Sequence, residues 1–375
     1  MASKSLSIFV HSFLLFMLGL SVGIISTSYR LNNFSSFPFT VPASIFSVST
    51  PSSSLSSPQS PPPLLPLNAS TKLDDKNKSL EWHNMTDDEL LRLAASSAAK
   101  TSKDVAKVAF MFLTPGPLPL APLWEKFFEG HQHLFSIYIH AHPSYNQSFP
   151  DTSVFYGRTI PSQPVSWGTI SMIDAERRLL ANALLDLSNQ RFVLLSDSCI
   201  PLFNFTTTYH YLMASTLSFL QSYDDPRKPG RGRYTRRMSP AITLHQWRKG
   251  SQWFQIRRDL AAKIVSDQKY YPVFRDHCLP PCYSDEHYLP TLVNILWPDA
   301  SSNRSVTWVD WSRGGSHPRK FGWIDVKVGV LDKIRFGGKE CVYNGNTTRI
   351  CFLFARKFLP NTSAPLLRLA PSLLA

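Results

Sequence analysis

The fold is decided by residues 105–140, which read VAKVAFMFLTPGPLPLAPLWEKFFEGHQHLFSIYIH. Residues 105–113 are mostly apolar, 114–117 (TPGP) break the run, 124–128 make a short helical stretch, and 134–140 are apolar again. An apolar run, a breaker, a short helix and a second apolar run predict the βαβ unit of a parallel sheet.

The same pattern returns further along the chain. Residues 174–187 carry apolar side chains at a helical spacing, and residues 192–195 (FVLL) form a run typical of a buried strand. We therefore expect an α/β fold, with a mainly parallel sheet and helices on both faces. Ligands of such sheets bind at the carboxyl ends of the strands, so the loops 114–117 and 196–198 should line the site.

The N-terminal part has a different composition. Residues 6–26 form an apolar segment of about 20 residues, which predicts a single transmembrane helix and leaves 1–5 as a cytoplasmic tail. A cleavable secretory signal is the alternative, although the apolar core of a signal has only about 7–15 residues. Residues 27–103 are rich in Pro and Ser and predict a disordered lumenal stem, which ends in a short helix that begins near Thr86. Residues 104–375 remain for one large lumenal domain.

Sequons and cysteines indicate the compartment. Nine of the fourteen asparagines stand in Asn-x-Ser/Thr sequons, all beyond the apolar segment, whereas chance would supply only about a third of them. They are Asn33, Asn68, Asn77, Asn84, Asn146, Asn204, Asn303, Asn346 and Asn361. A lumenal location follows, and it argues against nucleic acid as the partner of a chain with a net charge of +13.

The five cysteines suit an oxidising lumen. Cys278 with Cys282, and Cys341 with Cys351, are close pairs that predict two disulfides, and Cys199 is left as a free thiol. The alternative is that all five are reduced core residues.

Missing motifs narrow the chemistry. The sequence has no Gly-x-Gly-x-x-Gly, P-loop, Gly-x-Ser-x-Gly or His-Glu-x-x-His motif. The loop 196–198 (SDS) offers one carboxylate, a poor site for a hard cation, so no metal is expected. If a nucleoside diphosphate leaves without a metal, fixed cations must stabilise it, and basic residues are frequent in 313–357. A solvated basic face is the alternative for that stretch.

Residues 282–288 (CYSDEHY) place a carboxylate pair at a predicted helix start, where Ser284 can cap the helix. The helix dipole favours the charged form of Glu286, which makes it a candidate general base. The alternative is that Asp285 and Glu286 only stabilise the helix start.

Seven segments together carry a family resemblance. They are VAFMFLTPGPLP (108–119), FSIYIHAHP (135–143), FVLLSDSCIP (192–201), GSQWFQIRR (250–258), CYSDEHYL (282–289), WVDWSRGGSHP (308–318) and CFLFARKF (351–358). In these segments the chain resembles the core-2/I-branching N-acetylglucosaminyltransferases of glycosyltransferase family 14, and most closely their plant branch. The resemblance implies a GT-A-like fold and inverting, metal-independent transfer of a sugar, GlcNAc or a related one, from a UDP-sugar to a glycan hydroxyl. It also implies a Golgi type II membrane protein, held in the lipid by its N-terminal helix, with no cofactor.

The resemblance also assigns roles to residues. It implies that Glu286 is the base and that Lys357 and Arg349 stabilise the UDP diphosphate. The other donor-binding positions that it implies are Thr114, Pro115, Gly116, His140, Trp167 and Gly168. The acceptor-binding positions that it implies are Arg233, Arg236, Trp253, Asp310 and Trp311.

Two other functions stay open at this point. One is a non-catalytic glycan-binding or scaffolding Golgi membrane protein on the same fold. The other is a lumenal glycoside hydrolase, which needs two carboxylates facing each other across the bond. Asp285 and Glu286 are adjacent and diverge around a helix, so they cannot supply that pair alone.

Overall fold

The computed structural model describes residues 82–97, 102–338 and 340–375. Within these ranges, no helix is both long and apolar enough to span a bilayer. The predicted cytoplasmic tail (1–5), the predicted transmembrane helix (6–26) and most of the predicted stem (27–103) lie outside the described residues, and stay predictions.

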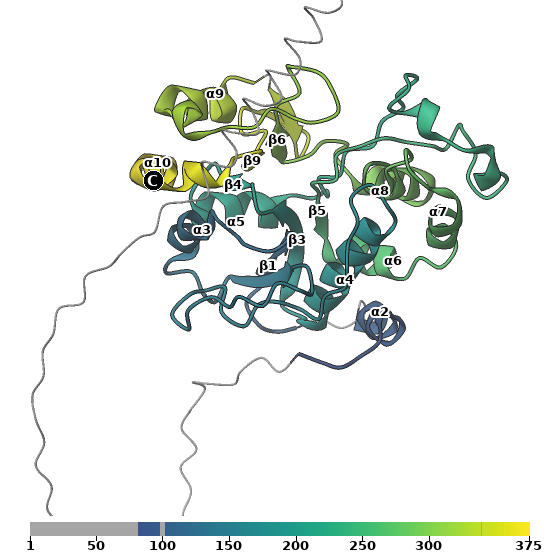
Figure 1. Ribbon diagram of the computed structural model, residues 1–375, viewed down its shortest axis with the longest axis horizontal. Coiled ribbons are helices and arrows are strands. Elements are labelled where there is room, and N and C mark those ends of the chain that lie inside the picture. Colours follow the sequence, from purple (N-terminus) through teal and green to yellow (C-terminus); the bar gives the residue numbers. More distant parts are fainter. Residues whose placement is uncertain (1–81, 98–101, 339) are drawn as a thin grey trace, which may run out of the picture. The chain divides into compact units, whose positions relative to one another are not determined.

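A four-stranded sheet forms the centre of the fold (Figure 1). Its order is β2 (Phe135–His140), β1 (Lys107–Leu113), β3 (Asn189–Ser196) and β5 (Gln255–Arg257). β1 runs parallel to both β2 and β3, and β5 is antiparallel to β3. The predicted α/β fold with a mainly parallel sheet is confirmed.

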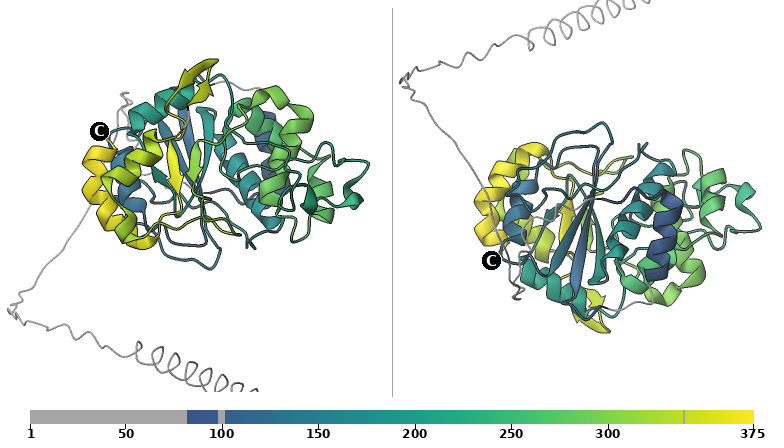
Figure 2. Two further views of the ribbon diagram at one scale, coloured as in Figure 1. Left: turned by 90° about the horizontal axis from the view of Figure 1, so that it is seen from above. Right: turned by 90° about the horizontal axis from the view of Figure 1, so that it is seen from below.

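Helices cover both faces of this sheet (Figure 1, Figure 2). One face carries α3 (Ala121–Phe128), α5 (Phe205–Ala214) and α10 (Ser363–Leu373), and the other carries α4 (Ser171–Leu185), α6 (Arg258–Val265) and α8 (Ser284–Leu296). Alternation along β1 explains the two layers: Phe110 and Phe112 pack against Trp124 of α3, whereas Met111 belongs to the core of the opposite face.

A second, smaller sheet adjoins the first sheet at the carboxyl ends of its parallel strands. It contains β4 (Ile200–Pro201), β9 (Phe354–Arg356) and β6 (Thr307–Val309), with β9 antiparallel to β4 and parallel to β6. The backbone N–H of Phe358, just after β9, donates to the carbonyl of Ser198, just after β3, at 3.0 Å. The carboxyl ends of β6 and β9 therefore come to the same edge as the carboxyl end of β3.

The remaining elements surround these two sheets. They are α7 (Tyr271–His277), α9 (Val328–Phe336), the hairpin of β7 (Cys341–Tyr343) and β8 (Asn346–Thr348), and 3₁₀ turns at Arg231–Arg233, Arg236–Met238, Pro298–Ala300, Trp323–Asp325 and Pro360–Thr362. Disulfides join Cys278 to Cys282 before α8, and Cys341 to Cys351 across the hairpin. Cys199 is free and buried.

Helix α2 (Asp87–Ser96) belongs to the compact unit, although its residues fall within the predicted stem. Thr86 and Glu89 form a capping box at its start, as the sequence predicted. Leu90 and Ala94 are buried in the core with α4 and α6, and Asp87 pairs with Arg178 of α4. The apolar stripe of α2 covers α4, so the folded unit begins before residue 104.

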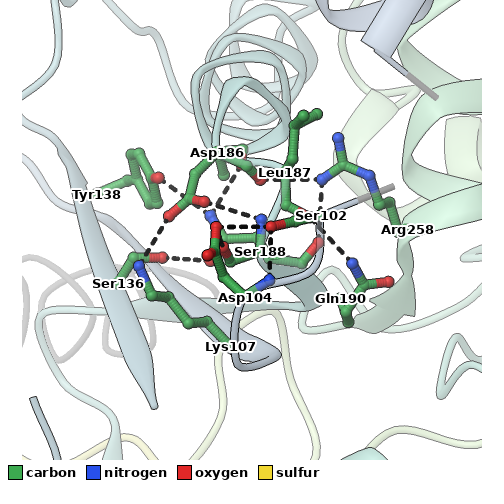
Figure 3. A network of polar contacts seen from close by, with 12 residues as sticks. Ser102, Asp104, Lys107, Ser136, Tyr138, Asp186, Leu187, Ser188, Gln190 and Arg258 are labelled. Atoms are coloured by element: carbon green, nitrogen blue, oxygen red, sulfur yellow. Dashed lines mark hydrogen bonds and ion pairs between the residues drawn. The ribbon is translucent and has the colours of Figure 1, made fainter. Parts of the chain in front are cut away.

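A network of polar contacts lies at the amino ends of β1 and β3 (Figure 3). Asp186, in the turn from α4 to β3, accepts from Lys107 Nζ at 3.3 Å and from the Ser188 backbone N–H at 2.9 Å. The guanidinium of Arg258, the first residue of α6, donates to the carbonyls of Leu184 (2.8 Å), Asp186 (3.0 Å) and Asn189 (3.0 Å). This one side chain therefore ties α6 to the α4–β3 turn.

We expect Arg258→Met to lower the free energy of unfolding by about 3 kcal/mol, because it leaves several buried carbonyls without a donor. The neighbouring Arg257 is more exposed and pairs with Asp259 at the surface, so Arg257→Met should cost about 1 kcal/mol or less. Chemical denaturation of the two variants checks this difference. Equal losses would contradict the role of Arg258.

Candidate active site

The turn after β1 is built from a short run of hydrogen bonds. The Thr114 backbone N–H donates to the His140 carbonyl at 3.0 Å, which joins the ends of β1 and β2. Thr114 Oγ1 accepts from the Gly116 N–H at 3.1 Å. A Cβ on Gly116 would lie 3.0 Å from the Tyr145 ring, so glycine lets the loop 114–117 pack closely there.

His140, at the carboxyl end of β2, is a buried neutral histidine. Its Nε2 lies 3.1 Å from Arg178 Nη1 and 3.4 Å from the Gln163 backbone N–H. Burial and the adjacent Arg178 charge lower the pKa of His140 to about 4. Two donors at Nε2 place the proton of the neutral ring on Nδ1.

The loop after β3 supplies one carboxylate and meets two cations. Burial raises the pKa of Asp197, and the charges of Arg356 and Lys357 oppose that rise. Among the described residues there is no group of three or more His, Cys, Asp or Glu side chains placed to hold a metal ion.

The first turn of α8 places Glu286 at this edge. Tyr283 precedes the helix in the left-handed region, with φ at 56°. Ser284 is the first helical residue and donates to the Thr169 carbonyl at 2.8 Å, so it does not cap α8. The predicted cap is therefore wrong: the Ser284 hydroxyl ties α8 to the segment before α4.

Two cations hold the Glu286 carboxylate. Arg233 Nη1 lies 2.5 Å from Glu286 Oε2, and Lys249 Nζ also contacts Oε2. Burial raises the pKa of Glu286, but Lys249 and Arg233 outweigh it and hold the pKa below its ordinary value. Glu286 is thus a charged carboxylate in a partly buried position.

Asp285 has the opposite environment. Burial, and then the charge of Glu286, raise the pKa of Asp285 to about 6. Its Oδ1 has no hydrogen-bond partner among the described residues. The two adjacent carboxyl groups therefore have different pKa values, and that of Glu286 is the lower.

Trp167 and Gly168 come to the same place from the segment before α4. Gly168 has φ at 76°, and a Cβ there would lie 2.9 Å from the Tyr283 ring. The Trp167 ring lies 5.0 Å from Tyr283 and 5.6 Å from His317 between centroids, and Trp167 is 59% exposed. An open aromatic rim therefore borders the start of α8, where the apolar face of a sugar can stack.

The five residues predicted to bind the acceptor do not all lie close to Glu286. Arg233 contacts Glu286 directly, and Asp310 and Trp311 follow β6 at the site edge, with Trp311 half exposed. Trp253 is buried under the Arg356 guanidinium, whose carbon lies 4.0 Å from the ring centroid. Arg236 is exposed in a 3₁₀ turn, and no described contact links it to Glu286.

Lys357 follows β9 directly, and Arg349 lies in the segment between β8 and β9. Lys357 follows β9 at the site edge, and burial and the Arg356 charge lower its pKa. Arg349 is exposed between β8 and β9, next to Ile350, whose carbonyl accepts from Tyr211 of α5 at 2.8 Å. Arg349 is not among the described charges that act on Lys357, which are those of Arg356, Asp197, Lys320 and Cys199. Arg356 is the arginine that the structure places beside Lys357.

A family model described as "Branch: Core-2/I-Branching enzyme" matches residues 108–335. The chain belongs to the core-2/I-branching enzyme family. It is also 37% identical over 310 residues to a rice protein (Oryza sativa subsp. japonica) named "Glycosyltransferase BC10", a match that covers 71% of this chain and 77% of the rice protein. The family resemblance of the sequence motifs is confirmed, and the protein is a glycosyltransferase.

Sequence reasoning missed Lys249 and assigned no particular role to Arg356 in this core-2/I-branching enzyme. Lys249 lies 37 residues before Glu286, and no sequence motif predicts that the two side chains contact each other. Arg356 was visible only as one basic residue among many in 313–357, although it adjoins the predicted Lys357. Its guanidinium is close enough to Asp197 and Asp285 for their charges to raise its pKa, while burial lowers it more.

Six of the nine sequons of this core-2/I-branching enzyme fall within the described residues. Asn84, Asn146, Asn303, Asn346 and Asn361 are exposed, and Asn204 is partly buried. Asn204 caps α5 through Oδ1, which accepts from the Thr207 N–H at 2.8 Å, so its Nδ2 remains the atom for a glycan. Asn33, Asn68 and Asn77 lie outside the described residues.

Proposed function

We propose that this glycosyltransferase moves a sugar, GlcNAc or a related one, from a UDP-sugar to a glycan hydroxyl by metal-independent inversion. The observation that carries the proposal is a charged Glu286 next to Asp285, whose charge acts on Arg356 at the end of β9, with Lys357 as the following residue. A base and a cation cluster are what the two ends of such a displacement require.

The acceptor hydroxyl is deprotonated by Glu286 as its oxygen attacks the anomeric carbon. A new glycosidic C–O bond forms on one face of that carbon, and the bond to the diphosphate oxygen breaks on the other. The proton goes to the carboxylate, and the bonding electron pair leaves with UDP. General-base help of this kind contributes about two to four orders of magnitude.

The departing diphosphate is stabilised by Lys357 and Arg356, in our proposal, in place of the pair predicted from the sequence. Lys357 feels the positive charges of Arg356 and Lys320, and Asp197 is the carboxylate that opposes them. Positive charge is therefore in excess at this point, and fixed cations act where charge develops in the transition state.

The donor subsite lies between the loop 114–117 and the turn at Trp167 and Gly168, and the acceptor subsite lies on the Arg233 and Trp311 side. Neutral His140 keeps Arg178 at the floor of the donor side. We also propose the Golgi membrane as the location, in the type II orientation. The sequons exposed on the folded unit and the predicted helix at 6–26 support it.

UDP release from the purified enzyme, given a panel of UDP-sugars and glycan acceptors, tests the reaction. We expect acceptor-dependent release with at least one pair, and activity that stays within about twofold in excess chelator, because side-chain cations replace a metal. Complete loss on chelation would contradict the metal-independent mechanism. Binding of glycans without UDP release from any pair would favour the glycan-binding alternative.

A further inference from the structure

The segment 248–250 is fixed against the first turn of α8. The Gly250 N–H donates to the Glu286 carbonyl at 2.9 Å, and Lys249 exchanges two backbone hydrogen bonds of 2.8 Å with Tyr223. A Cβ on Gly250 would lie 1.9 Å from the Gln221 carbonyl oxygen and 2.8 Å from Pro290 Cγ, so only glycine fits. The backbone of Lys249 is therefore held at a set place beside Glu286.

Both cations take the same carboxylate oxygen. Arg233 and Lys249 contact Oε2, and their side chains are 20% and 15% exposed. Arg233 also stacks on Tyr283, with its guanidinium carbon 4.3 Å from the ring centroid. No described side chain forms a hydrogen bond with Oε1. A carboxylate held by one oxygen presents the other in a defined direction.

We propose that Lys249 is a positioning residue that, together with Arg233, holds Glu286 Oε2 so that Oε1 faces the acceptor hydroxyl. This inference rests on the proposed function of Glu286 as the base. Arg233 was predicted as an acceptor ligand, and here it acts on the base as well.

The other charged groups around Glu286 do not cancel this arrangement. The titratable groups that face it come from four segments and are Tyr223, Arg233, Lys249, Asp285 and His287. Burial lowers the pKa of His287 to about 4, so that ring is neutral, and Asp285, with its pKa raised to about 6, loses its negative charge as the pH falls through that value. The two cations are thus the dominant charges, and they account for the lowered pKa of Glu286.

A lowered pKa has a kinetic consequence whose sign is fixed. Glu286 must be ionised to accept a proton, so kcat/KM falls on the acid side at the pKa of Glu286. Removing one cation raises that pKa, and activity is then lost at a higher pH than in the wild type. An opposite charge at this distance shifts a carboxyl pKa by about one to three units.

The test is the pH profile of kcat/KM for the wild type, Lys249→Met and Lys249→Arg. We expect the acid limb of Lys249→Met to move up by about one pH unit or more. We also expect its plateau to fall by about 10- to 100-fold through the lost orientation of the base. Lys249→Arg should keep the limb close to the wild-type position because it restores the cation.

Lys263→Met is the matched control, since Lys263 lies on α6 with its Nζ 5.3 Å from the Trp297 ring centroid, and none of its contacts in the described part of the chain is with a residue of the site. Should Lys249→Met fail to fold, Lys249→Gln provides the same measurement. A Lys249→Met or Lys249→Gln profile that coincides with the wild-type profile would overturn the inference. Full activity of Glu286→Gln would instead exclude Glu286 as the general base. Failure of the proposed function and failure of the Lys249 inference are therefore distinguishable.

Discussion

Glu286→Gln should lower the rate of sugar transfer by about two to four orders of magnitude while leaving the affinity for UDP nearly unchanged. The amide keeps the size of the side chain and its contact with Arg233, but it cannot accept the hydroxyl proton. Transfer assays and UDP binding by calorimetry on the same preparation check both parts of the expectation.

The neighbouring Asp285 supplies the control for this change. Its carboxyl is buried, with a pKa raised to about 6, so Asp285→Asn removes a carboxyl from the same turn without removing the base. We expect Asp285→Asn to retain most of the activity. Transfer by Glu286→Gln within about a factor of ten of the wild type would exclude Glu286 as the base.

Lys357→Ala should lower kcat/KM by about 100- to 1000-fold, the cost of removing one group that stabilises developing negative charge. Because the UDP diphosphate carries charge in the ground state as well, UDP should also bind more weakly. Arg356→Gln should have an effect of the same kind, since its guanidinium lies beside Lys357 at the end of β9.

Arg349→Ala tests which arginine acts with Lys357 on the diphosphate: Arg356, as the structure suggests, or Arg349, as the sequence predicted. Arg349 is exposed between β8 and β9, next to Ile350, whose carbonyl accepts from Tyr211. We therefore expect its loss to change kcat/KM by less than about twofold, as at a surface site away from the reacting groups. A loss equal to that of Lys357→Ala would show that Arg349, and not Arg356, is the partner of Lys357.

The main sheet could be predicted because its strands are long enough to carry a pattern. β1, β2 and β3 each contain a largely apolar run and are separated by helices, the arrangement of a sheet that is buried on both faces. β6 and β9 have three residues each and pair with segments far away in the chain, so no local periodicity could announce the second sheet.

Candidate site residues could be predicted from the sequence only where a single residue stood in a recognisable local pattern. Glu286 follows from the first turn of a helix, and Lys357 from a motif. Arg349 was paired with Lys357 through the family resemblance, but it precedes β9 whereas Lys357 follows that strand. Lys249 meets Glu286 through the packing of a loop on α8, which only the folded chain reveals.

The cap at Ser284 illustrates a third limit. Ser is a common N-cap, and the residue type favoured that role. Tyr283, in the left-handed region, takes the N-cap position, so α8 begins at Ser284, and the Ser284 hydroxyl donates to the Thr169 carbonyl instead. A local preference was overridden by a contact between segments 115 residues apart.

Helix α2 has a practical consequence for producing the enzyme. Asp87 pairs with Arg178, which is only 6% exposed and which also contacts His140 at the carboxyl end of β2. A recombinant form cut at residue 104, where the composition changes, would leave the Arg178 charge buried without its carboxylate. Assays on such a shortened protein would report on an enzyme whose proposed donor subsite is disturbed, whereas a form that begins upstream of Trp82 retains the contact between Asp87 and Arg178.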